Sequence, residues 1–344
     1  MSITTTTTTT TTETIANGKP LKYKLAPEIG QNLQNDLLAE ISRDGYTVIK
    51  NVIPADRAAR HQQNAFSWLK SFNNANLNIS DPTTWTAENL PVHSPINTFS
   101  KYAVNHERFI WDIRLEPGVL EVFEKIWGTD ELLVSFDALN VTFPNRRDVK
   151  PREPWEHVDQ SPVRRGLHCV QGIVNLSKSG PDDGGLVVYP GSHKLIEAFF
   201  ETQTEKNTWI EQDNYRLTQD QLSWFTDKGI KPLKVCAEPG DLIIWDSRLI
   251  HYGSEPTSKS NMIRTVLYAA YAPARFATEE QLALKKAVFE RFEGTTHWPH
   301  DNIRPRPNEA YLADGSLDPK NRDRPLTEPE YTDKLLKLAG AKRY

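Results

Sequence analysis

The segment Trp155-Glu-His-Val-Asp-Gln160 places an imidazole, His157, two residues before a carboxylate, Asp159. Residues i and i+2 of a β-strand point to the same face, so both side chains could bind one metal ion. A third ligand is available much later in the chain, at His251. Two histidines and one carboxylate are the ligand set of non-haem Fe(II) sites, which leave metal positions open for other molecules. A His-x-Asp tripeptide alone is a weak signal, so the surrounding sequence must decide.

The bulk composition restricts the classes of partner. The 344 residues include 41 basic and 45 acidic side chains, a net charge of −4, so no global field attracts nucleic acid or anionic membranes. No apolar run approaches the roughly 20 residues of a membrane span, and the N-terminus lacks the pattern of a signal peptide. Cys169 and Cys236 lie in apolar runs that are typical of strands, which predicts reduced, buried thiols and a cytoplasmic protein.

Apolar residues recur at helical spacing mainly before Gly128. The spacing predicts helices over residues 31–43, 55–72 and 117–127, and a late helix over 278–292. The polar, Pro-containing segment 73–100 is expected to form a long loop that borders or covers a pocket.

Short β-rich runs separated by Gly and Pro turns dominate after Gly128. They lie at 132–143, 166–176, 186–189, 233–237, 241–245 and 263–271, after an earlier run at 46–53. A helical and loop insertion is expected at 194–226. Many short strands preceded by helices predict a mainly β fold with flanking α-helices, a jelly roll, rather than alternating βαβ units.

Three parts of the chain are predicted. Residues 1–18 contain nine consecutive threonines and almost nothing apolar, so they should be disordered. Residues 19–292 should form a single jelly-roll domain with N-terminal helices. Residues 293–344 are a polar, Pro-containing extension, which could wrap the surface or support a homodimer.

Two later motifs carry a resemblance to a known family. Gly184-Gly-Leu-Val-Val-Tyr-Pro-Gly-Ser-His-Lys194 is followed by Glu238-Pro-Gly-Asp-Leu-Ile-Ile-Trp-Asp-Ser-Arg-Leu-Ile-His251 and by Arg264. Together with the His-x-Asp motif, this order resembles the phytanoyl-CoA dioxygenase family of Fe(II)/2-oxoglutarate oxygenases, over roughly residues 41–274.

The resemblance implies a cupin-like double-stranded β-helix with Fe(II) held by His157, Asp159 and His251 as the catalytic centre. It also implies 2-oxoglutarate and O2 as co-substrates, with Arg264 anchoring 2-oxoglutarate. Decarboxylation to succinate and CO2 would accompany hydroxylation, desaturation or ring formation on a small organic substrate. The Thr-rich start and the polar tail resemble fungal family members that tailor natural products, which favours a role in natural-product biosynthesis.

Several further residues have both a functional and a structural interpretation. Gln171 and Asn140 lie on the strands that flank the metal motif and could touch the co-substrate, or they could merely bond to the backbone. Arg264 could pair with Asp246 instead of with 2-oxoglutarate.

The substrate-binding candidates are Trp155, Phe136 and Arg165. The two aromatic rings could line an apolar pocket, although core packing would explain such rings equally well. Arg165, with its neighbours Arg152 and Arg164, could hold an anionic group, or the cluster could simply be solvated.

Two other functions compete with the oxygenase. One is a metal-dependent jelly-roll isomerase or hydrolase that does not use O2. The other is a non-catalytic jelly-roll binding protein.

Overall fold

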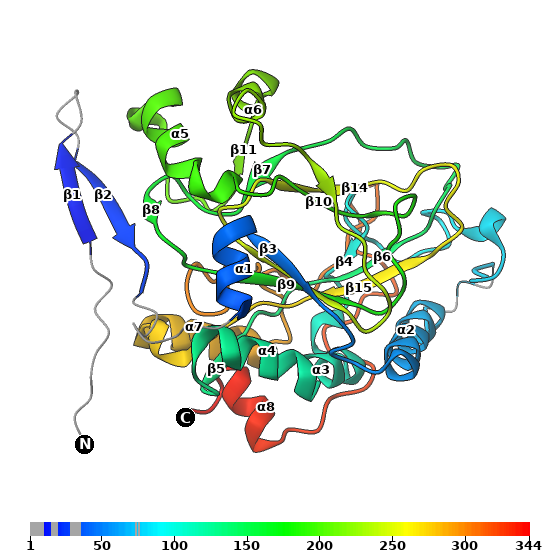
Figure 1. Cartoon of the computed structure of the whole chain (residues 1–344). Coiled ribbons are helices and arrows are strands. Elements are labelled where there is room, and N and C mark those ends of the chain that lie inside the picture. Colours follow the sequence, from blue (N-terminus) through cyan, green and yellow to red (C-terminus); the bar gives the residue numbers. More distant parts are fainter. Residues whose placement is uncertain (1–9, 15–19, 28–35, 73, 75) are drawn as a thin grey trace.

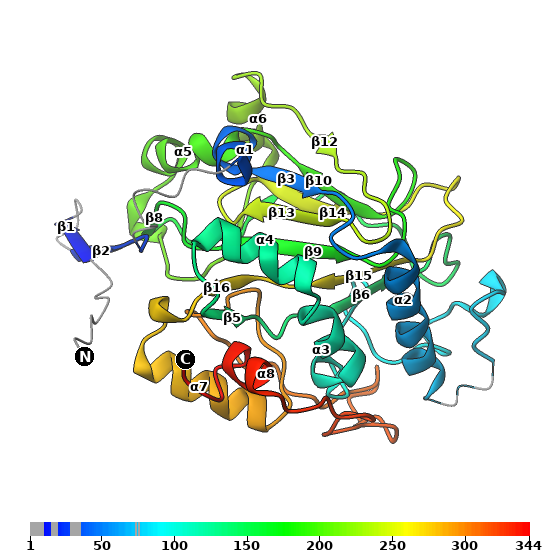
Figure 2. The same ribbon diagram turned by 60° about the horizontal axis from the view of Figure 1, so that its bottom comes forward.

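The computed structural model describes residues 10–14, 20–27, 36–72, 74 and 76–344, drawn in colour in Figure 1. Its centre consists of two antiparallel β-sheets that face each other, and helices cover the outer side of one of them (Figures 1 and 2). This arrangement is a double-stranded β-helix, or jelly roll, as the strand pattern predicted.

The larger sheet has six strands in the order β3-β13-β9-β15-β6-β4. Their bounds are β3 Tyr46–Ile49, β4 Thr98–Phe99, β6 Leu139–Thr142, β9 Val170–Asn175, β13 Leu242–Asp246 and β15 Arg264–Tyr268. The smaller sheet has five strands in the order β11-β7-β14-β10-β12. Their bounds are β7 His157–Val158, β10 Gly185–Val188, β11 Tyr215–Arg216, β12 Leu233–Lys234 and β14 His251–Ser254.

The pairing of strands that are distant in the chain assembles the metal motif. Strand β14 pairs with β7 so that His251 lies directly opposite His157. Opposed residues of an antiparallel pair have their Cβ atoms within about 5.5 Å of each other. Register alone therefore brings the two histidines together across almost a hundred residues of sequence.

Strand β9 separates two apolar layers. All six of its residues are buried. Ile173 packs between the sheets with Leu186 and Val266, whereas Val170 and Val174 join the large cluster under the helices. Because alternate side chains of a strand point to opposite faces, an apolar run of this kind indicates a strand covered on both sides.

The helices that cover the larger sheet are shown in Figure 2. Their bounds are α1 Asp36–Asp44, α2 Ala55–Lys70, α3 Arg108–Arg114, α4 Pro117–Trp127, α7 Glu279–Glu290 and α8 Asp333–Leu338. Helix α4 begins at Pro117, whose fixed φ suits a first turn, and ends at Trp127, before Gly128 in the left-handed conformation with φ 66°. None of the helices in the described part of the chain is both long and apolar enough to cross a membrane.

A second apolar cluster lies in the insertion between β10 and β12. Helices α5 Ile196–Gln203 and α6 Gln219–Thr226 contribute Phe199 and Phe225, which pack with Trp209. Two small sheets complete the fold. They are β1 Thr10–Thr14, β2 Pro20–Leu25 and β8 Arg164–Arg165 in one, and β5 Leu132–Val134 with β16 Tyr271–Pro273 in the other.

Several details differ from the sequence-based expectations. Thr10–Thr14, expected to be disordered, forms strand β1, while the rest of segment 1–18 lies outside the described residues. The first five residues of the helix expected at 31–43 also lie outside them. Helices α3 and α8 were not predicted. The apolar run 233–237 forms only the two-residue strand β12.

The cysteine prediction was half wrong. Both thiols are free, but only Cys169 is buried, and Cys236 is exposed. Its two neighbours, Val235 and Ala237, are buried, so Cys236 lies on the opposite, exposed side of this extended segment.

The C-terminal residues fold back onto the domain. Gly294 forms a β-bridge with Arg306, and Leu335 and Leu338 of α8 are buried in the cluster under the larger sheet. The extension therefore contributes to the core instead of only wrapping the surface.

Candidate metal and co-substrate site

His157, Asp159 and His251 form one buried cluster between the two sheets. Their ligand atoms all lie within 4.8 Å of one another. The carboxylate of Asp159 lies 3.6 Å from His157 Nε2 and 3.2 Å from His251 Nε2. No other group of this kind occurs among the residues that the structure describes. The three residues that the sequence motifs suggested thus come together in one cluster.

The backbone fixes which nitrogen of each imidazole faces the cluster. His157 Nδ1 lies 3.1 Å from the Trp155 carbonyl oxygen, and His251 Nδ1 lies 2.9 Å from that of Leu249. A backbone carbonyl accepts a hydrogen bond, so each Nδ1 carries the proton and each Nε2 keeps a free lone pair. This arrangement is typical of histidines that bind a metal.

The electrostatics of the cluster also suit a cation. Burial lowers the pKa of His157 to about 3, with His251 adding to the effect, so the imidazole is neutral at pH 7. Burial by itself would raise the pKa of Asp159, but the imidazoles of His297, His157 and His251 together hold it well below its usual value. The cluster thus offers two imidazole nitrogens and one carboxylate to a cation.

Gln171 and Trp155 hold the ligands in place. Gln171 Nε2 donates a hydrogen bond of 2.9 Å to Asp159 Oδ2. The Trp155 ring stacks on His157, with centroids 4.2 Å apart and 9° between the planes. Both residues line the same cavity as the cluster. Gln171 thus points inward and bonds to the Asp159 carboxylate, a partner that the sequence did not suggest.

Arg264 lies in the same cavity, only 4% exposed. Its Nη1 donates to Asn140 Oδ1 at 3.0 Å, and Asn140 is itself held by the Ile96 carbonyl and by Thr142. The alternative pairing with Asp246 is wrong, because that carboxylate binds Arg248 at 2.7 Å.

The guanidinium of Arg264 is not fully hydrogen-bonded and has no counter-charge among the described residues. Its Nε is buried without a partner, and no carboxylate in the described part of the chain lies within ion-pair distance of its guanidinium. A buried guanidinium without a counter-charge is unfavourable. It therefore suits the binding of an anion inside the cavity.

The cavity has a volume of about 270 Å³. Its lining includes residues that the sequence did not suggest, namely Asn97, Asp137, Asn214, Glu255, His297 and Arg306. His297 and Arg306 come from the C-terminal extension, where His297 Nε2 is buried without a partner. Arg306 Nη1 lies 3.8 Å from Asp137 Oδ1. No motif marked these residues, because loops far apart in the chain bring them to the site.

Two of the predicted substrate-binding residues lie elsewhere. Phe136 is fully buried and packs against Trp111 and Phe289, with ring centroids 5.9 and 6.0 Å away. Arg165 binds Glu201 at 2.5 Å and lies over the Tyr23 ring. Neither residue lines the cavity, so both predictions were wrong.

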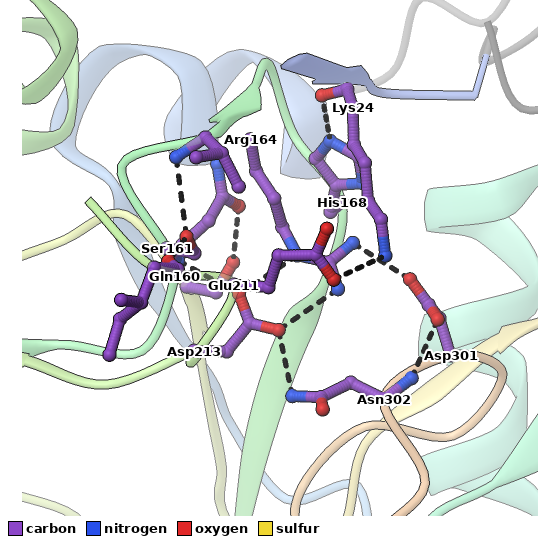
Figure 3. A network of polar contacts seen from close by, with 12 residues as sticks. Lys24, Gln160, Ser161, Arg164, His168, Glu211, Asp213, Asp301 and Asn302 are labelled. Atoms are coloured by element: carbon purple, nitrogen blue, oxygen red, sulfur yellow. Dashed lines mark hydrogen bonds and ion pairs between the residues drawn. The ribbon is translucent and has the colours of Figure 1, made fainter. Parts of the chain in front are cut away.

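The neighbouring Arg164 belongs to a buried polar network (Figure 3). Its Nε and Nη2 donate to the two oxygens of Asp213 at 2.8 and 2.9 Å, and its Nη1 donates to Asp301 at 2.8 Å. Asn302 donates to Asp213 as well. The network joins the loop after the metal motif to the insertion and to the C-terminal extension.

The family model of phytanoyl-CoA dioxygenase (PhyH) matches the chain over residues 41–266. The match covers more than half of the chain and includes the whole cluster. The chain belongs to the PhyH family. PhyH proteins of this type are Fe(II)/2-oxoglutarate dioxygenases, so Fe(II) and 2-oxoglutarate are its cofactor and co-substrate.

Relatives of this PhyH protein include a fungal biosynthetic protein. The Ava biosynthesis cluster protein O of Aspergillus versicolor is 40% identical over 267 residues, which cover 76% of this chain and 85% of that protein. A putative phytanoyl-CoA dioxygenase of Dictyostelium discoideum is 22% identical over 249 residues, 61% of this chain and 67% of that one.

A solved structure shares the fold of the PhyH protein. The GlcNAc-inducible gene 2 product of Candida albicans matches with a TM-score of 0.59 at 14% identity, covering 92% of this chain and 78% of that one. At this identity the likeness concerns the fold alone.

Proposed function

We propose that this PhyH protein oxidises a small organic substrate in natural-product biosynthesis, with His157, Asp159 and His251 as the iron ligands. The observation that carries the proposal is the presence of the three ligands and the unpaired Arg264 in one cavity. The A. versicolor relative, named for a biosynthesis cluster, supports the biosynthetic role. The O2-independent enzyme and the non-catalytic binding protein are set aside by the family assignment.

Each residue of the site has a role in this proposal. Bound Fe(II), 2-oxoglutarate and O2 together supply an oxidant that removes hydrogen from the substrate, while 2-oxoglutarate becomes succinate and CO2. Arg264 anchors the distal carboxylate through its planar guanidinium, which Asn140 orients. Gln171 fixes the orientation of Asp159 by its hydrogen bond to Oδ2.

The remaining lining of the cavity suits a substrate that has both an apolar part and a polar part. The Trp155 ring offers an apolar face beside His157. His297 Nε2, buried and unpartnered, can bond to a hydroxyl, amide or carbonyl group. The lining also holds the charged groups of Arg152, Glu255 and the Arg306–Asp137 pair. The reaction on that substrate is a hydroxylation, a desaturation or a ring formation.

The experiment that tests the proposal compares iron content and succinate release in the wild type and three variants. His157→Ala, Asp159→Ala and His251→Ala should each lose stoichiometric Fe(II) and all 2-oxoglutarate-dependent succinate release. His193→Ala is the matched control, since His193 is another buried histidine, bonded to the Ser42 carbonyl outside the cluster. Succinate release that persists in all three cluster variants contradicts the ligand assignment.

The compartment and the assembly state are further parts of the proposal. We infer a cytoplasmic location, for which the two free thiols are the supporting observation. A homodimer is testable by the mass of the intact protein in solution. A monomeric mass rules it out. Deletion of the C-terminal extension is not a suitable test, because Leu335 and Leu338 belong to the core.

A further inference from the structure

Lys234 lies directly behind one wall of the active-site cavity. It belongs to the edge strand β12 and pairs with Val187 of β10. Its Nζ donates to Ser254 Oγ at 2.6 Å and to the Asp183 carbonyl oxygen at 2.8 Å. A Cβ added to Gly185 would lie 2.8 Å from this Nζ. Gly185 and Ser254 both line the cavity. The ammonium group of Lys234 therefore lies on the far side of these two residues from the cavity.

Lys234 has no acidic partner in the described part of the structure. The nearby Asp183 offers it only a backbone oxygen, because the Asp183 carboxylate accepts hydrogen bonds from Ser260 and from the Gly180 amide. Lys234 and Arg264 are thus two neighbouring cations, neither of which is paired with a carboxylate. Arg264 in the cavity and Lys234 behind its wall interact electrostatically, and both charges favour the binding of an anion in the cavity.

As long as no anion is bound, the surroundings of Lys234 favour the neutral amine over the charged ammonium. Burial lowers the pKa of Lys234 to about 8, and the positive charge of Arg264 acts in the same direction. Cys236 and Asp183 raise the pKa of Lys234, but by less than burial and Arg264 lower it. A bound carboxylate would favour the charged ammonium, so anion binding and protonation of Lys234 should be coupled.

We propose that Lys234 is a positioning residue for 2-oxoglutarate, which orients Ser254 and adds a second positive charge behind the wall next to Arg264. Because Lys234 donates to Ser254 Oγ, the Ser254 hydroxyl must use its own proton elsewhere. Its acceptor here is the Gly185 carbonyl at 3.2 Å, a long bond for a hydroxyl donor. The hydroxyl is therefore free to turn towards a carboxylate in the cavity. The inference rests on the proposed function, in which Arg264 anchors 2-oxoglutarate.

The test measures the affinity for 2-oxoglutarate without any substrate. Fe(II)-loaded protein is titrated anaerobically with 2-oxoglutarate, and the visible charge-transfer band of the chelate gives Kd from about pH 6.5 to about pH 9.5. The wild type should bind about five- to tenfold more weakly at the upper end, where Lys234 is neutral. Lys234→Met should bind about tenfold more weakly at pH 7, with a flat pH profile.

Two further variants separate the charge of Lys234 from its packing. Lys234→Arg keeps a positive charge over the whole pH range, so its affinity should stay near that of the wild type at pH 7 and should not fall at higher pH. Lys231→Met removes an exposed lysine of the same segment and should behave like the wild type. Cys236→Ser should keep the pH dependence, which excludes titration of the exposed thiol.

The outcomes distinguish this inference from the function on which it rests. If the wild-type protein shows no band at any pH, the proposed function fails. If the band forms but Lys234→Met binds 2-oxoglutarate like the wild type, Lys234 is only structural. If Lys234→Met does not fold, the pH profiles of the wild type and of Lys234→Arg still test the role of the Lys234 charge. If the affinity for 2-oxoglutarate falls equally at high pH in both proteins, the inference is overturned.

Discussion

Arg164 and Arg264 are two equally buried arginines with opposite surroundings. They are 3% and 4% exposed, respectively. Arg164 makes three hydrogen bonds to two carboxylates, those of Asp213 and Asp301 (Figure 3). Arg264 makes one, to the neutral amide of Asn140. The first guanidinium is neutralised by the fold, and the second is not.

The difference separates a cation with a structural role from a cation that is available to a ligand. A buried ion pair holds segments together, and removal of one partner leaves the other charge uncompensated. A buried cation without a counter-ion lowers the stability of the empty protein, and a bound anion offsets that loss. Arg164 therefore fixes strand β8, which follows the metal motif. In the proposed function, Arg264 is the cation that binds 2-oxoglutarate.

The largest effect is expected from Arg164→Met. The substitution leaves the carboxylates of Asp213 and Asp301 without their guanidinium, which should lower the free energy of unfolding by about 3–5 kcal/mol. Chemical denaturation measures this change. If Arg164→Met is as stable as the wild type, the network does not have the structural role described here.

The matched variant Arg264→Met should not destabilise the empty protein. It removes a buried cation and leaves no carboxylate unpaired, so the free energy of unfolding should be unchanged or higher. Saturating 2-oxoglutarate with Fe(II) should raise the Tm of the wild type and leave that of Arg264→Met almost unchanged, because affinity falls about 100-fold, or about 2.7 kcal/mol. An equal rise in Tm in both proteins contradicts the anchor role.

A smaller effect is expected at Asp301, and it should depend on pH. Burial alone would raise the pKa of Asp301, but the charge of Arg164 holds it below its usual value. Such a group contributes stability above its unfolded pKa of about 3.9, and the contribution is lost as pH falls. Asp301→Asn should therefore cost about 1–2 kcal/mol at pH 7 and progressively less below about pH 4. Thermal unfolding at several pH values measures this, and a loss that does not depend on pH speaks against the ion pair.

The smallest effect is expected at Arg165. Its contact with Glu201 is partly open to solvent, with the two side chains 17% and 35% exposed, so Arg165→Met should cost about 1 kcal/mol or less. Because Arg165 lies outside the cavity, the affinity for 2-oxoglutarate should not change. A clear loss of affinity in Arg165→Met would restore the binding role that the structure argues against.

The sequence predicted those parts of the site that depend on local patterns. The residues picked out by the His-x-Asp spacing, by the strand that follows Pro-Gly-Asp and by the later Arg264 do line one cavity, because strand alternation decides which side chains share a face. Gln171 and Asn140 lie on regular strands, but their side-chain partners Asp159 and Arg264 were not predicted.

The remaining residues depend on long-range packing, which no local pattern records. The partners of Arg164 lie 49 and 137 residues away from it in the chain. Phe136 lies between β5 and β6, outside any strand. The alternation of side chains along a strand therefore could not predict the direction in which it points. His297 and Arg306 reach the cavity only because the C-terminal extension folds back, and a polar extension does not reveal where it packs.

The most direct test of the account is the charge-transfer band itself. Fe(II) and 2-oxoglutarate are added anaerobically to the wild type, to Asp159→Ala and to Arg264→Met, with Arg304→Met as a control for an exposed arginine outside the cavity. The account predicts the band in the wild type and the control, no band in Asp159→Ala, and a much higher 2-oxoglutarate requirement in Arg264→Met. A wild type without the band, or an Arg264→Met protein with unchanged affinity, would contradict it.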